Sequence, residues 1–178
     1  VAVPLSLGQA KLNAGPQAPL YRRILRRSLK LFLLGVILSN LYAWYDAVDL
    51  SKMRYMGVLQ RIALVYFVAA ILFLKLSPRA LAFIAGAILL AYTALLYAPL
   101  PTGEAADLGV KGLNIVSWVD RVLLGEHAFY DGALGYDPEG LLSTLPAIAQ
   151  CLIGVVTGQW LAERDRNARV PIKLGSAG

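Results

Sequence analysis

Four long apolar stretches, separated by segments that alternate in charge, constrain the fold of this chain more than any other feature. Each approaches the roughly 20 apolar residues that a membrane-spanning helix needs, and they cover residues 31–45, 57–76, 80–98 and 140–162. Lys and Arg gather in residues 11–30, 75–79 and 164–173, whereas seven of the eleven acidic residues lie in residues 99–139. By the positive-inside rule, the basic segments face the cytoplasm and residues 99–139 face the other side. The sequence therefore predicts an all-α, polytopic integral membrane helix bundle with four complete spans and a long outer loop.

The composition favours a membrane protein and argues against a nucleic-acid partner. Hydrophobic residues make up 58% of the chain and charged residues 16%, well below the roughly 25% of charged residues in soluble domains. The net charge is +6, but the arginines stand beside apolar spans, where the lipid bilayer and its anionic headgroups are the expected partner. The single cysteine, Cys151, excludes an internal disulfide and a cysteine-based metal site.

Both ends of the chain suggest a longer protein. The chain opens at Val1, without an initiator Met, in what reads as the tail of an apolar segment, and residues 168–178 form a polar tail. We therefore expect residues 1–178 to be part of a single, larger transmembrane domain. The sequence does not decide whether the protein forms a homo-oligomer.

A basic segment leads into the first apolar stretch. Its cations are spaced three or four residues apart, which places most of them on one side of a helix; they are Arg22, Arg23, Arg26, Arg27 and Lys30. One interpretation is an anchor against anionic lipid. The other is a phosphate-binding rim for an anionic cofactor that approaches from the cytoplasm, because Arg binds phosphate in a bidentate manner.

Three polar residues lie at the outer ends of the first two spans. Asn40 is near the end of the first, and Gln60 and Arg61 follow the start of the second. An Arg at the centre of a spanning helix costs about 2.5–3.5 kcal/mol on insertion scales. Arg61 lies only about 6 Å inside Gly57 at 1.5 Å per residue, so its side chain can extend to the interface and avoid much of that cost. Gln60 and Arg61 could serve either in a structural hydrogen-bond network or in a functional site.

The outer loop, residues 99–139, predicts an ordered lid or pocket wall. It has an apolar periodicity that indicates a short amphipathic helix, in Ile115, Trp118, Val119, Val122 and Leu123. It also carries titratable residues, among them Asp120, His127, Tyr130, Asp137 and Glu139. His127 is the only histidine and hence the one obvious candidate for general acid or base catalysis, although a lone loop histidine is more often a bystander. No two-histidine helix spacing supports a metal site.

Residues 136–140, with the sequence YDPEG, predict the start of the fourth span. Asp137 is expected to cap it, with Pro138 at the first helical position and Glu139 in the first turn, where the helix dipole favours an anion. A functional interpretation adds to this one, because Asp137 and Glu139 at the membrane surface could bind an amino or hydroxyl group of a sugar.

Four runs of sequence resemble the heparan-alpha-glucosaminide N-acetyltransferase family and its bacterial relatives. They are RSLKLFLLGVILSN at 27–40, MRYMGVLQRIALVYFVAAIL at 53–72, WVDRVLLGEHAFY at 118–130 and YDPEGLLSTLPAI at 136–148. The resemblance implies a polytopic acyltransferase that takes acetyl from cytoplasmic acetyl-CoA and delivers it to an amino sugar on the opposite face.

The resemblance also implies roles for particular residues. The basic rim would hold the phosphates of coenzyme A, and the amino-sugar site would draw on Asn40, Gln60, Arg61, Asp120, His127, Tyr130, Asp137 and Glu139. The histidine proposed as catalytic in the family has no matching position in this chain, and His127 matches a later histidine on the substrate side. The resemblance leaves open whether the sugar amine attacks the acetyl thioester directly or receives the acetyl group after relay through a histidine.

Two other functions remain from the residues themselves. The first is an amino-sugar transporter, in which Asn40, Gln60, Arg61 and Asp137 would line a path and no acyl group would move. The second is a structural membrane subunit. The short loops and the lack of a glycosylation acceptor at Asn114 favour a bacterial inner membrane, with residues 99–139 in the periplasm.

Overall fold

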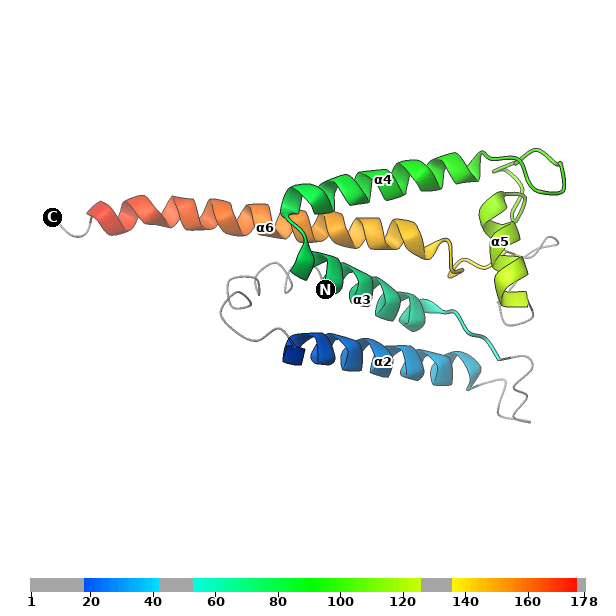
Figure 1. Cartoon of the computed structure of the whole chain (residues 1–178), viewed down its shortest axis with the longest axis horizontal. Coiled ribbons are helices and arrows are strands. Elements are labelled where there is room, and N and C mark those ends of the chain that lie inside the picture. Colours follow the sequence, from blue (N-terminus) through cyan, green and yellow to red (C-terminus); the bar gives the residue numbers. More distant parts are fainter. Residues whose placement is uncertain (1–17, 42–52, 126–135, 176–178) are drawn as a thin grey trace.

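The computed structural model describes residues 18–41, 53–125 and 136–175, with side chains to Arg164, and all of its regular elements are helices (Figure 1). They are α2 (Ala18–Asn40), α3 (Val58–Lys75), α4 (Pro78–Leu96), α5 (Ile115–Leu124) and α6 (Thr144–Gly175). Three of these helices contain stretches long and apolar enough to cross a membrane, namely Val58–Lys75, Pro78–Leu96 and Thr144–Arg164. The predicted all-α membrane bundle is therefore confirmed.

The α3–α4 hairpin forms where the sequence places it. Lys75 lies in the last turn of α3, where the helix dipole favours a cation. The Ser77 side chain then accepts a hydrogen bond from the backbone N–H of Ala80 at 3.3 Å, and Pro78 occupies the first turn of α4. The predicted spans 57–76 and 80–98 correspond to α3 and α4 with small shifts at their ends.

Only residues 31–41 of the predicted first span, residues 31–45, lie within the described residues, and the helix there ends at Asn40. The basic segment and the apolar stretch form one continuous helix, α2, which ends at Asn40. Its uncharged part, residues 31–40, is about 15 Å long at 1.5 Å per residue, half of the roughly 30 Å hydrocarbon core. Within the described residues, three helices rather than four meet the criteria for spanning. Tyr42, Trp44 and Tyr45 lie outside them.

The predicted start of the fourth span is wrong, because α6 begins at Thr144 rather than at residue 140. The carboxylate of Asp137 accepts a hydrogen bond from the N–H of Glu139 at 2.9 Å, and its carbonyl accepts one from the N–H of Gly140 at 3.2 Å. Asp137 thus closes a tight turn instead of capping a helix. Two further turns, closed by Thr144 N–H to Leu141 O and Leu145 N–H to Leu142 O, lead into α6.

The core lies where α3, α4 and α6 meet. It contains small and large apolar side chains in alternation, which lets the helices approach closely; they are Ala69, Phe73, Leu81, Ala85, Ile148, Ala149, Leu152 and Val155. Helix α2 packs antiparallel to α3 on the other side of α3, through buried Ile24 and Ala63. Phe83 and Leu90 are 78% and 75% exposed, as expected for side chains that face lipid.

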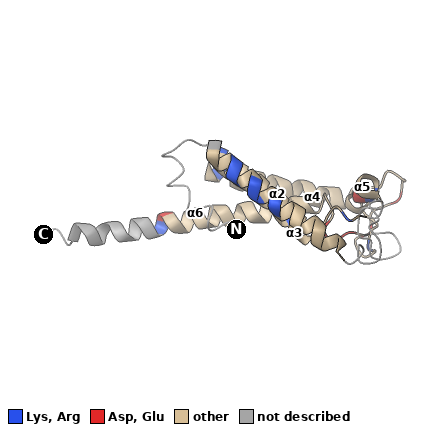
Figure 2. Ribbon diagram, turned by 90° about the horizontal axis from the view of Figure 1, so that it is seen from below, with Lys and Arg blue, Asp and Glu red and all other residues tan. Residues whose placement is uncertain are grey.

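The bundle has a basic end and an acidic end (Figures 1 and 2). The start of α2 and the α3–α4 turn lie at one end, and α5 lies at the other together with the start of α6. Helix α5 confirms the predicted short helix in the outer loop, with Asn114 as its cap, accepting from Ser117 N–H at 2.9 Å. The end of its apolar stripe is exposed, however: Val122 and Leu123 are about 60% exposed, Ile115, Trp118 and Val119 are partly buried, and the fully buried side chains are Val116, Ser117 and Asp120.

Candidate functional site

A cavity of about 320 Å³ opens at the acidic end, between α4, α5 and the turn that precedes α6. We call it the outer pocket. Two of its carboxylates are nearly inaccessible, with Asp120 only 2% and Asp137 only 3% exposed. The remaining polar residues of its wall are Tyr92, Lys111, Asn114, Ser117, Tyr136 and Ser143. Buried carboxylates beside aromatic rings suit a ligand that carries an amine and hydroxyl groups.

The side chain of Asp120, in α5, binds the backbone of the turn that leads into α6. One carboxylate oxygen, Oδ1, accepts from the N–H of Leu142 at 3.0 Å. Burial raises the pKa of Asp120, and hydrogen bonds from the N–H groups of Leu142 and Leu141 oppose that rise, while the charge of Asp137 adds to it. A Cβ at position 140 would overlap the other oxygen of Asp120. Gly140 is therefore needed for the close approach of the carboxylate to the backbone.

Arg54 ties the segment before α3 to the turn that begins at Asp137. Its Nη2 lies 2.5 Å from Glu139 Oε2 and 3.4 Å from Asp137 Oδ1. The amide side chain of buried Asn40 holds the backbone of Arg54, accepting from its N–H at 2.6 Å and donating to its carbonyl at 2.9 Å. The end of α2 is thus linked through Arg54 to one wall of the outer pocket.

Arg61 holds the same turn from α3. Its Nη1 donates to the carbonyl of Pro138 at 3.0 Å, and its Nη2 donates to the carbonyl of Ser143 at 2.8 Å. One carbonyl belongs to the turn and the other to the residue directly before α6, so Arg61 links α3 to both. The side chain therefore reaches the acidic end of the bundle, as its position near the start of α3 predicts.

Gln60 lies at the interface between α2 and α3 and is fully buried. Its Nε2 donates to the hydroxyl of Ser39 at 3.3 Å, and the amide lies close to Gly35 and Gly57, where an added Cβ would press against it. Its Oε1 has no hydrogen-bond partner within the described residues. Gln60 contributes to the contact between the helices and is absent from the wall of the outer pocket.

The structure brings most of the predicted substrate-side residues to one end of the bundle. Asp120 and Asp137 line the outer pocket, whereas Asn40, Arg61 and Glu139 hold the segments around it. His127 and Tyr130 fall outside the described residues. The sequence prediction missed Arg54 and most polar residues of the wall, namely Tyr92, Lys111, Asn114, Ser117 and Ser143. The position of Arg54 inside the run MRYMGVLQR was the one signal that could have singled it out.

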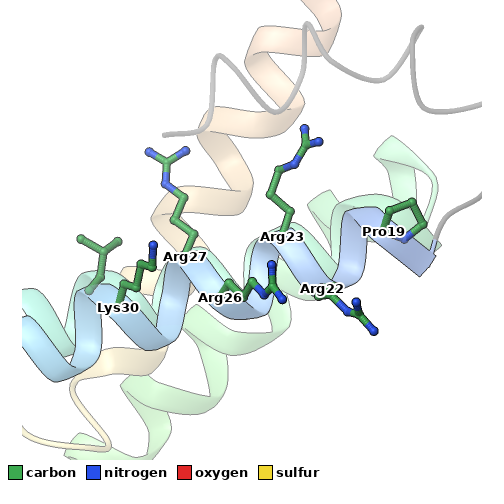
Figure 3. Close-up of a pocket in the computed structure, with 7 residues that line it drawn as sticks. Pro19, Arg22, Arg23, Arg26, Arg27 and Lys30 are labelled. Carbon is green, nitrogen blue, oxygen red and sulfur yellow. The ribbon is translucent and has the colours of Figure 1, made fainter.

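The five predicted phosphate-binding cations line one face of α2, at the opposite end of the bundle (Figure 3). We call this face, formed by Arg22, Arg23, Arg26, Arg27 and Lys30 with Pro19 and Leu31, the basic face; it borders a space of about 860 Å³. In this view Arg23 and Arg27 extend above the helix and Arg22 extends below it. The guanidinium of Arg27 lies 5.1 Å from the ring centroid of Tyr66 on α3, within the range of a cation–π interaction.

Comparison with known proteins identifies the family. The family model described as heparan-alpha-glucosaminide N-acetyltransferase, catalytic, matches residues 3–177. The chain belongs to this family. It is 29% identical over 181 residues to the heparan-alpha-glucosaminide N-acetyltransferase of Mus musculus and 28% identical over 181 residues to that of Homo sapiens. Both matches cover 78% of this chain, which spans about a quarter of the length of these relatives, 28% and 27% respectively.

Proposed function

We propose that this chain forms part of a transmembrane acetyltransferase, which moves acetyl from acetyl-CoA at the basic end to an amino sugar or related glycan at the acidic end. One observation carries the proposal. A phosphate-suited cationic face and a carboxylate-lined pocket lie toward opposite ends of the bundle of apolar helices. Family membership adds the acetyl transfer to this arrangement.

The basic face fits the donor, because coenzyme A carries several phosphate charges and Arg binds phosphate through paired N–H groups. We assign the phosphates to the basic face, in which Arg27 also lies against Tyr66 of α3. The thioester of acetyl-CoA supplies the activated acetyl group. The residues of this chain bind and orient the two reactants.

The outer pocket fits the acceptor, because Asp120 and Asp137 would attract and orient the ammonium group of an amino sugar. The amine must lose a proton before its nitrogen forms the new bond to the acetyl carbon, while the carbon–sulfur bond breaks and the thiol of coenzyme A leaves. A carboxylate with a raised pKa is suited to receive such a proton. We keep two routes, direct attack and relay through a histidine, and His127 stays a substrate-side candidate.

We further propose that the basic end faces the cytoplasm and the outer pocket faces the periplasm of a bacterial inner membrane. The positive-inside rule supports this orientation, because the α3–α4 turn, with Lys75 and Arg79 beside it, and the basic face lie toward one end, and the carboxylates of the outer pocket lie toward the other.

Steady-state kinetics of the complete acetyltransferase that contains this chain test the two assignments separately. Asp120→Asn is expected to raise KM for glucosamine and leave KM for acetyl-CoA within about twofold, whereas the double variant Arg23→Gln/Arg27→Gln is expected to do the reverse. Detergent size-exclusion profiles control for folding. Equal changes in both KM values for both variants, with normal profiles, would refute the assignments. Saturable sugar uptake without any acetylation would favour a transporter instead.

A further inference from the structure

The side chain of Asn40 binds backbone groups rather than the outer pocket. Asn40 is the last residue of α2, is 2% exposed, and does not belong to the pocket wall. Its Nδ2 donates to the carbonyls of Val36 and Arg54 at 2.7 and 2.9 Å, and its Oδ1 accepts from the N–H of Arg54 at 2.6 Å. A carboxylate of the same size could accept here but could not donate. The amide is therefore matched to this position.

Arg54 depends on Asn40 for the position of its backbone. Residues 53–57 precede α3 and have no regular secondary structure, so the hydrogen bonds of a helix do not fix this segment. Asn40 binds both the N–H and the carbonyl of Arg54, across 14 residues of sequence. Loss of the amide would remove two backbone hydrogen bonds at once, and the backbone of Arg54 would be free to shift.

The side chain of Arg54 in turn holds the turn beside the outer pocket. Its guanidinium pairs with Glu139 and with Asp137, and the side chain of Asp137 is fully buried. A carboxylate is stable in a buried place when it is paired and hydrogen-bonded. Asp137 also lines the outer pocket. The position of Arg54 therefore helps to decide where this carboxylate lies in the pocket wall.

We infer that Asn40 and Arg54 are positioning residues of the acceptor site. Asn40 holds the backbone of Arg54, and Arg54 holds Asp137 and Glu139 in the turn that forms one wall of the outer pocket. We call this arrangement the Asn40–Arg54 link. Asn40 thus acts on the sugar through other residues and is not a ligand of it. The inference rests on the part of the proposed function that places an amino sugar in the outer pocket, and it does not require acetyl transfer.

Ser39 offers a matched control for the link. It directly precedes Asn40, and its hydroxyl also joins α2 to α3, by accepting a hydrogen bond from Gln60 Nε2 at 3.3 Å. This bond leads to Gln60, which is absent from the pocket wall, rather than to Arg54. Ser39→Ala therefore disturbs the same helix contact without touching the link.

Equilibrium binding of glucosamine and of coenzyme A to the complete protein that contains this chain, in detergent, tests the link. Asn40→Ala and Arg54→Gln are each expected to weaken glucosamine binding about three- to tenfold, the range that corresponds to one or two lost hydrogen bonds. Both should leave the affinity for coenzyme A within about twofold. Ser39→Ala should leave both affinities within about twofold. Arg54→Lys keeps the charge and should recover part of the glucosamine affinity that Arg54→Gln loses.

The double variant Asn40→Ala/Arg54→Gln separates a link from two independent structural effects. If Asn40 acts through Arg54, the double variant should bind glucosamine about as well as Arg54→Gln alone. Losses that multiply in the double variant would overturn the link. A loss of glucosamine binding in Ser39→Ala as large as in Asn40→Ala would overturn it too, and so would an equal loss of coenzyme A binding in the link variants.

The same measurements separate the link from the proposed function. A wild type that binds glucosamine but does not acetylate it would refute the acetyl transfer and leave the link in place. A wild type that does not bind glucosamine would refute the acceptor site and the link together. Should Asn40→Ala fail to fold, the Arg54 variants decide, because glucosamine affinity in Arg54→Gln equal to that of the wild type would overturn the link.

Discussion

The two ends of this molecule use arginine in opposite ways. At the acidic end, Arg54 and Arg61 are bound to other parts of the same chain, Arg54 to two carboxylates and Arg61 to two backbone carbonyls. At the basic end, the cations of the basic face are exposed and make no ion pair with a described residue. Arginines that are satisfied internally fix the shape of a site, whereas exposed arginines are available to a ligand or a lipid surface.

The largest effect on stability should follow from filling the space between Gly140 and Asp120 at the acidic end. Gly140→Ala places a Cβ against the carboxylate of Asp120, and overpacking of this kind costs about 1–3 kcal/mol of folding free energy. Thermal unfolding in detergent is expected to show a lower midpoint. Gly86→Ala is the matched control, because a Cβ there meets nothing within 4 Å. An unchanged midpoint for Gly140→Ala would contradict the tight contact of Asp120 with this turn.

The ion pair of Arg54 should contribute a smaller but specific amount. A double-mutant cycle of Arg54→Gln and Glu139→Gln is expected to give a coupling of about 1–2 kcal/mol in unfolding free energy, because the side chains are partly buried, at 25% and 22% exposure. Arg79→Gln, at the exposed basic end, should change stability by less than about 0.5 kcal/mol. A coupling near zero between Arg54 and Glu139 would remove the distinction between the two ends.

Asp120 should make stability depend on pH. Burial raises its pKa in the folded protein above the ordinary 3.8. At pH values between 3.8 and this raised pKa, the folded protein therefore binds more protons than the unfolded chain. Stability contributed by this group is present below 3.8 and is lost as pH rises through the folded pKa. Unfolding free energies of wild type minus Asp120→Asn, measured across this window, should therefore fall with rising pH and then level off. A flat or rising difference would show that the carboxylate is not destabilised by burial.

Arg23 and Arg27 of the basic face should contribute little to stability. Arg23→Gln/Arg27→Gln is expected to change the unfolding free energy by only about 0.5–1 kcal/mol, through loss of the contact between Arg27 and Tyr66. Its affinity for coenzyme A should nevertheless fall about tenfold or more in an equilibrium binding assay. A large loss of stability with unchanged affinity would place these arginines with Arg54 as structural residues.

The sequence predicts those parts of the fold that depend on local pattern. Apolar length gives α3 and α4, and the period of Ile115, Trp118 and Val122 gives α5. The sequence pattern does not decide the structure where the same residues suit both a helix cap and a turn. Asp137 followed by Pro138 fits a helix cap, but the same carboxylate closes a turn on Glu139, and only the structure separates these cases.

The site depends on contacts that local pattern does not contain. Arg54 reaches Asp137 across 83 residues and Arg61 reaches Ser143 across 82. The charge of Asp120, by contrast, could be assigned to the substrate side from composition alone, because it lies in the acidic outer loop. Its hydrogen bond to Leu142 depends on how α5 sits beside the start of α6 and could not be inferred from sequence.

The most direct test of the central claim is the sidedness of acetyl transfer. Labelled acetyl-CoA and glucosamine are supplied on chosen faces of oriented vesicles that carry the complete acetyltransferase containing this chain. The account predicts acetylated sugar only when acetyl-CoA is on the face of the basic end and the sugar is on the face of the outer pocket. Transfer with both reactants on one face, or none in any arrangement, would contradict it.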